Sequence, residues 1–223
     1  MTKAARRTRS LAMSRTQIKI CGLKTREAVE AAAAAGATHI GLNLYAPSPR
    51  GISVEDAAKL RQAVPESVKA VLLLVDLEPD EARRAIAAVK PDIVQFHGSE
   101  SPEQCASLGS TLDIPVWKAV GVKDESSLEQ AQRYVSAVDM ILYDAPPGKL
   151  PGGQGIKLDW SLLAGYSHRA PWGLAGGLNA SNVCDAIRQT GAPLVDTSSG
   201  VESAPGVKDI DKIAAFCQAV RQC

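Results

Sequence analysis

Short runs of branched apolar residues recur along the chain and alternate with longer segments of helix-forming residues. The first run, residues 17–21, has apolar side chains at Ile18 and Ile20 with Lys19 between them. This period of two predicts a strand with two different faces, and Gly22 then permits a turn toward a helix. Similar apolar runs predict further strands at residues 39–45, 68–75, 92–96, 115–120, 139–143, 172–175 and 193–196.

Segments rich in strong helix formers separate these strands. Residues 23–36 include five consecutive alanines and end at Gly36, which suits a helix C-cap. Ser53 suits the N-cap of the next helix, which has an acidic first turn. The predicted helices cover residues 23–36, 54–64, 79–89, 102–108, 125–135, 159–163 and 209–220, with one more after the seventh strand that is capped by Asn179 or Ser181.

Strict alternation of strands and helices predicts an α/β fold with a parallel sheet. About eight strand and helix pairs in this length is the number in a (β/α)8 TIM barrel. An open doubly wound sheet is the alternative, but no GxGxxG motif follows the first strand, which removes the main sign of a dinucleotide site. Because no change in composition marks a linker, residues 17–223 are predicted to form a single barrel domain.

The first sixteen residues differ from the rest of the chain. Residues 1–16 carry five basic side chains and no acidic one, and they lack the apolar stretch of a secretory signal. They predict a disordered basic tail outside the fold. A transit peptide and a true start at Met13 are the alternatives.

Composition excludes several classes of partner. With 45% hydrophobic residues and a net charge of +1, the chain has no charge excess that would favour nucleic acid or a membrane surface. The five cysteines are odd in number, widely spaced and without a CxxC pair, so we expect neither a disulfide framework nor a metal site. This cysteine usage favours a reducing cytoplasm. The cysteines are Cys21, Cys105, Cys184, Cys217 and Cys223.

Several side chains capable of chemistry lie where the predicted strands end. Cys21 is the last residue of the first strand, and ligands bind at the carboxyl ends of strands in parallel α/β folds. Most free cysteines are small buried hydrophobes, so this position alone leaves both interpretations open. The other residues at or just beyond strand ends are Arg50, Asp76, His97, Asp144 and Asp196.

Two segments predict an anion site. Gly176 and Gly177 bring backbone amides to a helix start after the seventh strand, and Ser198, Ser199 and Gly200 add amides and hydroxyls after the eighth. Many barrels of this fold bind phosphate at this position. The alternative is that the glycines only make tight turns.

Six short motifs follow one another after residue 16. They are KICGL at 19–23, SPR at 48–50, VQFHG at 94–98, LYD at 142–144, LAGGL at 174–178 and VDTSSGVE at 195–202. Each motif alone is weak. Together, in this order and spacing, they resemble the N-(5'-phosphoribosyl)anthranilate isomerase family of tryptophan biosynthesis over nearly the whole chain after the tail.

The resemblance implies an Amadori rearrangement of a small phosphorylated aminosugar, without a metal or an organic cofactor. Matched residue by residue, Cys21 falls on the family's general base, Asp144 on its general acid and Arg50 on the residue that holds the anthranilate carboxylate. Asp196 falls on a polar substrate contact, although it could instead orient its loop. His97, at a strand end, is a candidate either for substrate binding or for a structural hydrogen bond. Related barrels occur as monomers and as dimers, so a homodimer stays open.

The implied roles agree with the chemistry of these side chains. A cysteine acts as a base only as thiolate, so the pKa of Cys21, ordinarily near 8.5, must be lowered or its small thiolate fraction used as it is. Helix N-terminal amides near Leu23 and the ammonium of Lys19 could help, although Lys19 could equally point elsewhere. Asp144 must hold a proton at neutral pH, which burial under the following loop would favour. The planar fork of Arg50 suits a carboxylate.

The chain departs from the family in the long Pro- and Gly-rich segment after the sixth strand. Relatives more often have GGTGKTF where this chain has GGQGIKL at 152–158, and Asp76 replaces a common asparagine. These changes bear on affinity more than on reaction type. The related sugar isomerase of histidine biosynthesis is a second hypothesis, but Cys21 stands where it has an aspartate. An inactive phosphosugar-binding barrel is a third, and it predicts loss of Cys21, Arg50 or Asp144, which are all present.

Overall fold

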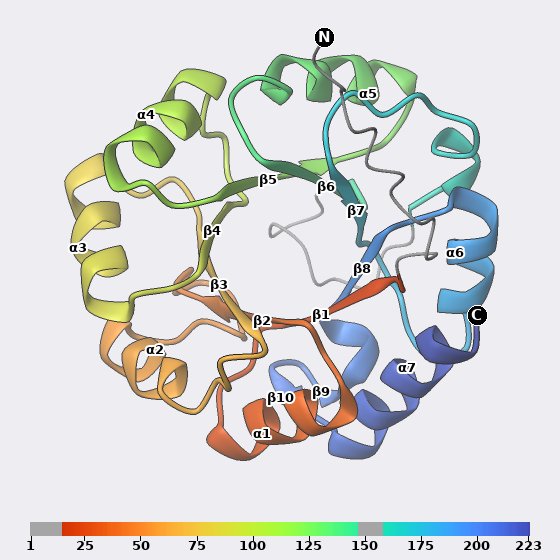
Figure 1. Ribbon diagram of the computed structural model, residues 1–223, viewed down its shortest axis with the longest axis horizontal. Coiled ribbons are helices and arrows are strands. Elements are labelled where there is room, and N and C mark those ends of the chain that lie inside the picture. Colours follow the sequence, from red (N-terminus) through yellow and green to blue (C-terminus); the bar gives the residue numbers. More distant parts are fainter. Residues whose placement is uncertain (1–14, 147–157) are drawn as a thin grey trace, which may run out of the picture.

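The computed structural model describes residues 15–146 and 158–223. Eight parallel strands close into a barrel in sequence order, which confirms the predicted (β/α)8 architecture (Figure 1). The barrel closes between its first and last strands, where Lys19 pairs in register with Asp196. The strands are β1 (Gln17–Cys21), β2 (His39–Asn43), β3 (Lys69–Leu74), β4 (Ile93–Phe96), β5 (Val116–Gly121), β6 (Met140–Asp144), β7 (Trp172–Leu174) and β8 (Leu194–Thr197).

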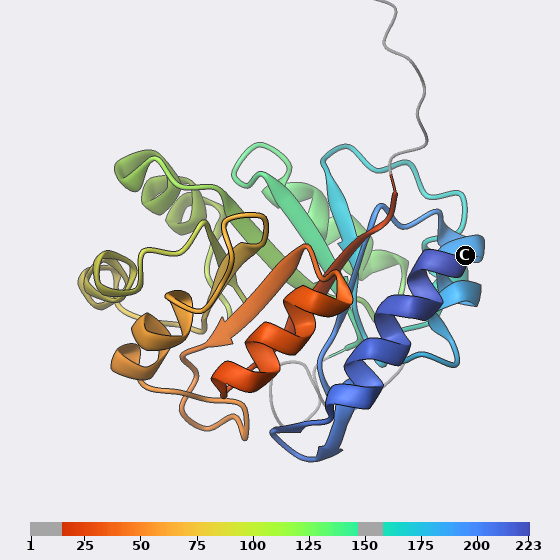
Figure 2. The same ribbon diagram turned by 60° about the horizontal axis from the view of Figure 1, so that its bottom comes forward.

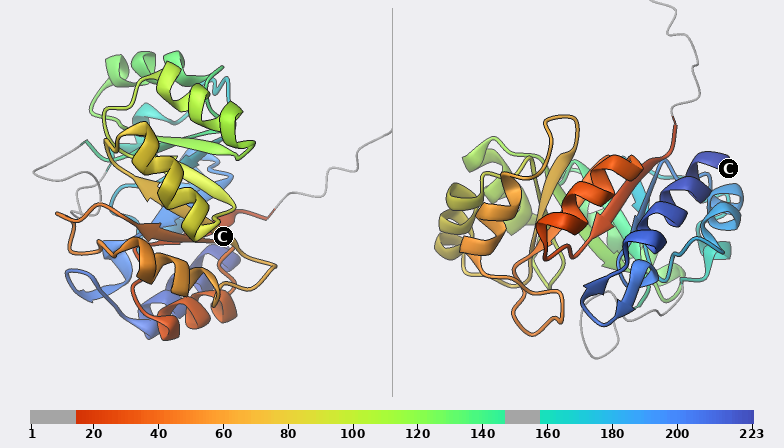
Figure 3. Two further views of the ribbon diagram at one scale, coloured as in Figure 1. Left: turned by 90° about the vertical axis from the view of Figure 1, so that its left-hand side faces the viewer. Right: turned by 90° about the horizontal axis from the view of Figure 1, so that it is seen from below.

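Helices surround the strands on the outside of the barrel (Figures 1 and 3). Helices α1 and α7, the first and the last, lie side by side, so the two ends of the described fold meet (Figure 2). The helices are α1 (Arg26–Ala35), α2 (Val54–Arg61), α3 (Pro79–Val89), α4 (Pro102–Leu112), α5 (Glu125–Ala131), α6 (Val183–Thr190) and α7 (Ile210–Gln222), with 3-10 turns η1 (Gln132–Tyr134), η2 (Trp160–Leu162) and η3 (Ser199–Val201).

Alternation along each strand produces two separate apolar layers. Ile18 and Ile20 point outward into the core between strands and helices, whereas Cys21 belongs to a smaller cluster inside the barrel. Lys19 shares the inward face with Cys21, because side chains two apart in a strand lie on the same side. The inside of the barrel therefore carries polar groups within an apolar wall, and Lys19 and Gln95 are both fully buried.

Some predicted boundaries are wrong for local reasons. Helix α1 begins at Arg26 because the Thr25 side chain caps it by accepting from the Ala28 amide. Helix α4 continues past the predicted end at residue 108 and includes Gly109. A Cβ on Gly109 would lie 3.1 Å from a Val116 methyl. The glycine there permits close packing and does not end the helix.

Two other predicted helices also differ. The segment at 159–163 forms only the 3-10 turn η2, because Asp159 accepts from the Ser161 amide two residues on and fixes a short turn. Helix α6 has Asn182 at its N-cap position, in place of Asn179 or Ser181, since the Asn179 side chain binds Ser181 in the preceding turn.

The last part of the chain contains features that the sequence did not indicate. A short antiparallel hairpin, β9 (Glu202–Ala204) and β10 (Val207–Lys208), follows the barrel's last strand and lies beyond the carboxyl ends of the strands (Figure 2). Cys184 of α6 forms a disulfide with Cys223, their Cα atoms 5.3 Å apart. The expectation of no disulfide is therefore wrong, because 39 residues separate two cysteines that only the closed barrel brings together.

The disulfide predicts a thiol count. Unfolded without reductant, the protein should present three reactive thiols, those of Cys21, Cys105 and Cys217. After reduction it should present all five. Titration with a chromogenic thiol reagent measures both numbers, and five thiols before reduction would contradict the bond.

Two sets of predictions fall partly outside the described residues. One concerns the predicted basic tail, of which residues 1–14 lie outside. The other concerns the Pro- and Gly-rich segment, of which residues 147–157 lie outside, with the departures at Gln154 and Ile156. Within the described residues, no helix has the length and apolar character needed to cross a membrane.

Candidate active site

The predicted site residues converge on one cavity at the carboxyl ends of the strands. Of the eleven candidates at strand ends and in the two anion-site segments, all but Asp76 and Gly200 line it. Asn43, Tyr45 and Ser48 also contribute, from the end of β2 and the turn that follows it. The candidates in the wall are Cys21, Arg50, His97, Asp144, Gly176, Gly177, Asp196, Ser198 and Ser199.

Cys21 lies at the end of β1, where the neighbouring strands leave space for its sulfur. A Cβ on Gly41 of β2 would stand 2.8 Å from Cys21 Sγ, so the glycine opposite makes room for the thiol. Gly22 follows with a φ of 76°, a left-handed conformation that turns the chain out of the barrel. Burial raises the pKa of the Cys21 thiol, although the nearby Lys19 ammonium acts in the opposite direction.

A buried ion pair lies one layer below the thiol. Lys19 Nζ is 2.8 Å from Asp196 Oδ2, and the Lys19 side chain is fully buried. Burial alone would lower the pKa of Lys19, but Asp196 and Cys21 favour its charged form and the pKa lies above its ordinary value. Asp196 was expected to contact substrate, and its Oδ2 is instead engaged with Lys19. Its Oδ1 has no hydrogen-bond partner among the described residues.

Asp144 and His97 lie together on the opposite part of the cavity wall, on β6 and just beyond β4. Asp144 Oδ1 accepts a 2.8 Å hydrogen bond from the Ala145 amide, and Asp144 Oδ2 is 3.3 Å from His97 Nε2. His97 was predicted to bind substrate. The structure places it in the cavity wall and beside the candidate acid.

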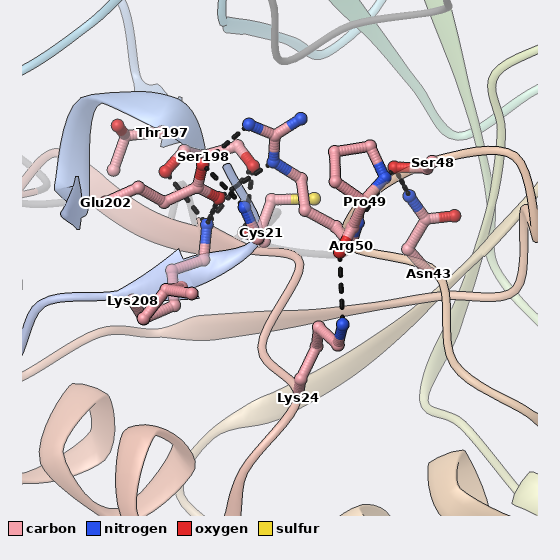
Figure 4. A network of polar contacts seen from close by, with 12 residues as sticks. Cys21, Lys24, Asn43, Ser48, Pro49, Arg50, Thr197, Ser198, Glu202 and Lys208 are labelled. Carbon is pink, nitrogen blue, oxygen red and sulfur yellow. Dashed lines mark hydrogen bonds and ion pairs between the residues drawn. The ribbon is translucent and has the colours of Figure 1, made fainter. Parts of the chain in front are cut away.

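Arg50 is nearly buried, and a carboxylate of the protein already binds part of its guanidinium. Arg50 Nε donates to Glu202 Oε1 at 2.8 Å, and Nη2 donates to Glu202 Oε2 at 2.6 Å (Figure 4). That Arg50 holds the anthranilate carboxylate stays a prediction, but Glu202 already occupies the edge of its fork formed by Nε and Nη2. Nη1 donates to no described residue, and Arg50 is part of the cavity wall.

The two glycine- and serine-containing segments form a continuous wall. Gly176 and Gly177 have φ values of 85° and 68°, which expose successive amides in a turn that a side chain would strain. Gly200 packs behind this wall, because a Cβ there would collide with the Leu178 carbonyl oxygen at 1.9 Å. Gly200 therefore supports the predicted phosphate segment by joining the loops after β7 and β8.

Sequence reasoning missed two charged residues beside the site, Glu202 and Lys208, and left open whether Lys19 points toward Cys21. For Lys19 a signal existed, since it lies two residues from Cys21 on a strand and must share its face. No comparable signal existed for Glu202 and Lys208, because the hairpin that carries them has no apolar alternation. Asp76, another strand-end residue, accepts hydrogen bonds from Ser99 and is absent from the cavity wall.

The described residues contain no group of three or more His, Cys, Asp and Glu side chains that could hold a metal ion. The cavity wall carries a thiol, a carboxyl group beside an imidazole, a guanidinium and the glycine-containing segments with their backbone amides. A parallel barrel with such a set at its strand ends defines a TIM-barrel enzyme that works by proton transfer on an anionic small molecule.

Comparison with known proteins identifies the family. The family model for N-(5'phosphoribosyl)anthranilate (PRA) isomerase matches residues 18–219. A protein of that name from Erythrobacter litoralis is 61% identical over 206 residues, which cover 92% of this chain and 99% of the relative. The chain belongs to the N-(5'-phosphoribosyl)anthranilate isomerase family.

Solved structures agree. The phosphoribosyl anthranilate isomerase of Thermotoga maritima is 35% identical, with a TM-score of 0.85, and the match covers 93% of this chain and 100% of that one. A second similar structure is a phosphoribosyl anthranilate isomerase in complex with reduced 1-(o-carboxyphenylamino)-1-deoxyribulose 5-phosphate. It is 35% identical, with a TM-score of 0.83, and the match covers 93% of this chain and 100% of that one.

Proposed function

We propose that this chain converts N-(5-phosphoribosyl)anthranilate to 1-(2-carboxyphenylamino)-1-deoxyribulose 5-phosphate, the Amadori rearrangement of tryptophan biosynthesis. Cys21 serves as general base and Asp144 as general acid. One observation carries the assignment: the thiol and the carboxyl group come from strands that are not neighbours, β1 and β6, and both enter one cavity. Family membership and the bound analogue in a similar structure support the choice of substrate.

The reaction needs two proton transfers. Asp144 gives a proton to the furanose ring oxygen while the bond from C1 to that oxygen breaks, and the nitrogen lone pair forms a C1–N double bond. Cys21, as thiolate, then removes the proton from C2. The electron pair of the broken C2–H bond forms the C1–C2 double bond, and the electron pair of the C1–N double bond returns to nitrogen, so the imine becomes an amine. Protonation at C1 and loss of the hydroxyl proton at C2 give the ketone.

The surroundings of each group suit its role. His97, 3.3 Å from the Asp144 carboxylate, can return a proton to it between turnovers. Lys19, beneath Cys21, favours the thiolate over the thiol, against the effect of burial. Burial outweighs Lys19 and raises the pKa of Cys21, so the free protein holds Cys21 mostly as thiol.

Recognition of the substrate's two anionic groups follows from the Arg50 guanidinium and the backbone amides in the wall. We place the phosphate at the amides of Gly176 and Gly177 and at Ser198 and Ser199, supported behind by Gly200. The anthranilate carboxylate lies at the open edge of Arg50. Asp196 Oδ1 and the His97 ring are the proposed contacts for sugar hydroxyls.

Substitution of Arg50 by lysine tests the carboxylate contact. Lysine keeps the charge but cannot bond Glu202 and the ligand through one planar fork. Losing one charge-assisted bond should cost about 1.5–3 kcal/mol, roughly a 10- to 100-fold fall in kcat/KM. Most of it should appear in KM, because the carboxylate is charged in both ground and transition states. A large fall in kcat at unchanged KM would assign Arg50 to the reacting centre instead.

A substrate comparison tests the proposed function. Phosphoribosylanthranilate, followed by its fluorescence in a coupled assay, should be converted. The two-phosphate aminosugar of the histidine pathway should not, because Cys21 replaces an aspartate that its isomerase uses. Conversion of the second substrate alone would favour the histidine-pathway hypothesis, and conversion of neither would favour an inactive binding barrel.

Cysteine usage no longer supports a cytoplasmic location, because Cys184 and Cys223 form a disulfide, and the proposal keeps that location on family membership alone. The proposal also includes a homodimer. The dimer is supported by the phosphoribosylanthranilate isomerase of Thermotoga maritima, a dimeric protein of which monomers were generated. Light scattering after gel filtration should give twice the 23.4 kDa of one chain. The mass of a single chain would contradict the dimer.

A further inference from the structure

The hairpin β9–β10 has no part in the barrel, yet it presents two charged side chains to the cavity wall from behind. Glu202 begins β9, directly after the phosphate segment, and Lys208 ends β10. Their side chains are only 4% and 3% exposed. Burying two long charged side chains is costly unless each makes all its hydrogen bonds, so their bonding partners indicate which parts of the site they fix in place.

Glu202 has every carboxylate contact occupied. Besides the two bonds from Arg50, its Oε1 accepts from Lys208 Nζ at 2.7 Å and its Oε2 accepts from the Gly206 amide at 3.2 Å. Burial alone would raise the pKa of Glu202, but the bonds from Arg50 and Lys208 outweigh it and hold the pKa below its ordinary value. The carboxylate is thus a fixed anion between two cations.

Lys208 connects this anion to the phosphate segment and to β1. Its Nζ donates to the Ser198 carbonyl at 2.8 Å and lies 3.3 Å from Ser198 Oγ. Ser198 Oγ in turn donates to the Cys21 carbonyl at 3.1 Å. One chain of contacts therefore runs from Arg50 through Glu202 and Lys208 to Ser198 and the backbone of Cys21 (Figure 4).

Packing leaves the stem of Arg50 little room to move. A Cβ on Gly22 would stand 3.0 Å from Arg50 Cβ and Cγ, so the stem lies directly over the glycine. On the other side, a Cβ on Gly206 would be 2.2 Å from the Pro49 carbonyl oxygen, and Lys24 Nζ donates to that same oxygen at 3.1 Å. The turn before Arg50 is thereby held against the tip of the hairpin.

We propose that Glu202 is a positioning residue for Arg50, and that Lys208 ties Glu202 to the phosphate segment, so that the hairpin sets the spacing between the carboxylate and phosphate subsites. This inference rests on the proposed function. Glu202 takes the inner edge of the guanidinium, formed by Nε and Nη2, and so directs the outer edge toward the ligand. Two cations against one carboxylate leave the cluster net positive, which suits an anionic ligand.

Glu202→Gln tests the inference. Glutamine replaces one of the two carboxylate oxygens by an NH2 group. This group would face an N–H donor of Arg50 or Lys208, so the guanidinium would lose a bond and its fixed direction. The readout is the ratio of kcat/KM for phosphoribosylanthranilate to kcat/KM for N-(5-phosphoribosyl)aniline, which lacks the carboxylate. In the variant this ratio should fall about tenfold, the value of one charge-assisted hydrogen bond of about 1.5 kcal/mol.

Glu100→Gln is the matched control. Glu100 is also buried and pairs with a lysine, Lys118, at 3.2 Å, but it contacts neither Arg50 nor the hairpin. Any general cost of removing a buried charge should appear in both variants. The substrate ratio should change in Glu202→Gln and stay that of the wild type in Glu100→Gln.

The outcomes separate the possible roles. An equal loss for both substrates in Glu202→Gln would overturn the inference, since it would make the residue purely structural. If that variant does not fold, Glu202→Asp keeps the charge but withdraws it by one methylene; a smaller fall of the ratio supports positioning and an unchanged ratio overturns it. A wild-type protein that converts neither substrate would overturn the proposed function, and this inference with it. Conversion of both substrates by the wild type, with an unchanged substrate ratio in the Glu202 variants, would overturn this inference but not the proposed function.

Discussion

Asp144→Asn should lower kcat by about 100-fold or more while leaving KM nearly unchanged, because a general acid typically contributes about 10²–10⁴-fold. An asparagine can keep the bond that Oδ1 accepts from the Ala145 amide, so the end of β6 should hold its shape. Its NH2 group cannot give up a proton to the ring oxygen. Steady-state kinetics with phosphoribosylanthranilate measure both constants.

Asp139→Asn is the matched control for this variant. Asp139 directly precedes β6 and also accepts a backbone hydrogen bond, from the Val116 amide at 2.8 Å, but it lies at the other end of the barrel. The control should keep the wild-type kcat. If Asp144→Asn retained more than about a tenth of kcat, another group would be the acid.

Cys21→Ala should cause a fall of similar size, about 10²–10⁴-fold in kcat, because alanine has no group that can accept the proton from C2. Cys105→Ala is its control. Cys105 is a fully buried thiol on α4, outside the cavity wall, and burial raises its pKa to about 12. Both variants lose a buried sulfur, but only the first should lose turnover. Equal activity of the two variants would remove Cys21 from the mechanism.

The pH dependence of alkylation reports the state of the Cys21 thiol. Burial raises its pKa above the ordinary value, so below pH 8 the free protein should hold mostly thiol and react slowly. The rate should climb with pH and still be rising at about pH 9, where an ordinary thiol of pKa near 8.5 is mostly ionised. Substrate should slow the reaction. A rate that levels off below pH 8 would show a lowered pKa, and inactivation that substrate does not slow would point to another thiol.

The barrel and most of the cavity wall could be predicted because they depend on local patterns. Alternation at Ile18, Lys19 and Ile20 defines a strand whatever lies beside it, and strict strand–helix alternation leaves few architectures. Once the strands are parallel, their carboxyl ends must meet, so Cys21 and Asp144 converge although 123 residues separate them. The glycine-containing segments follow for the same reason.

The sequence could not show which side chains pair when they meet only in the closed fold. Arg50 and Glu202 are 152 residues apart, and only the return of the chain after β8 brings the carboxylate to the guanidinium. The pairing of Lys19 with Asp196 depends on the register of β1 against β8. Cys184 and Cys223 likewise meet only because α6 lies beside α7.

The most direct test of the central claim compares the wild-type protein with the double variant Cys21→Ala, Asp144→Asn in one assay of phosphoribosylanthranilate conversion. Circular dichroism should show the same fold for both. We expect rapid conversion by the wild type and, for the double variant, a rate equal to that of buffer alone, since the two groups supply the two proton transfers. Conversion well above the buffer rate by the double variant, or none by the wild type, would contradict the assignment of Cys21 and Asp144 as the base and acid of this isomerase.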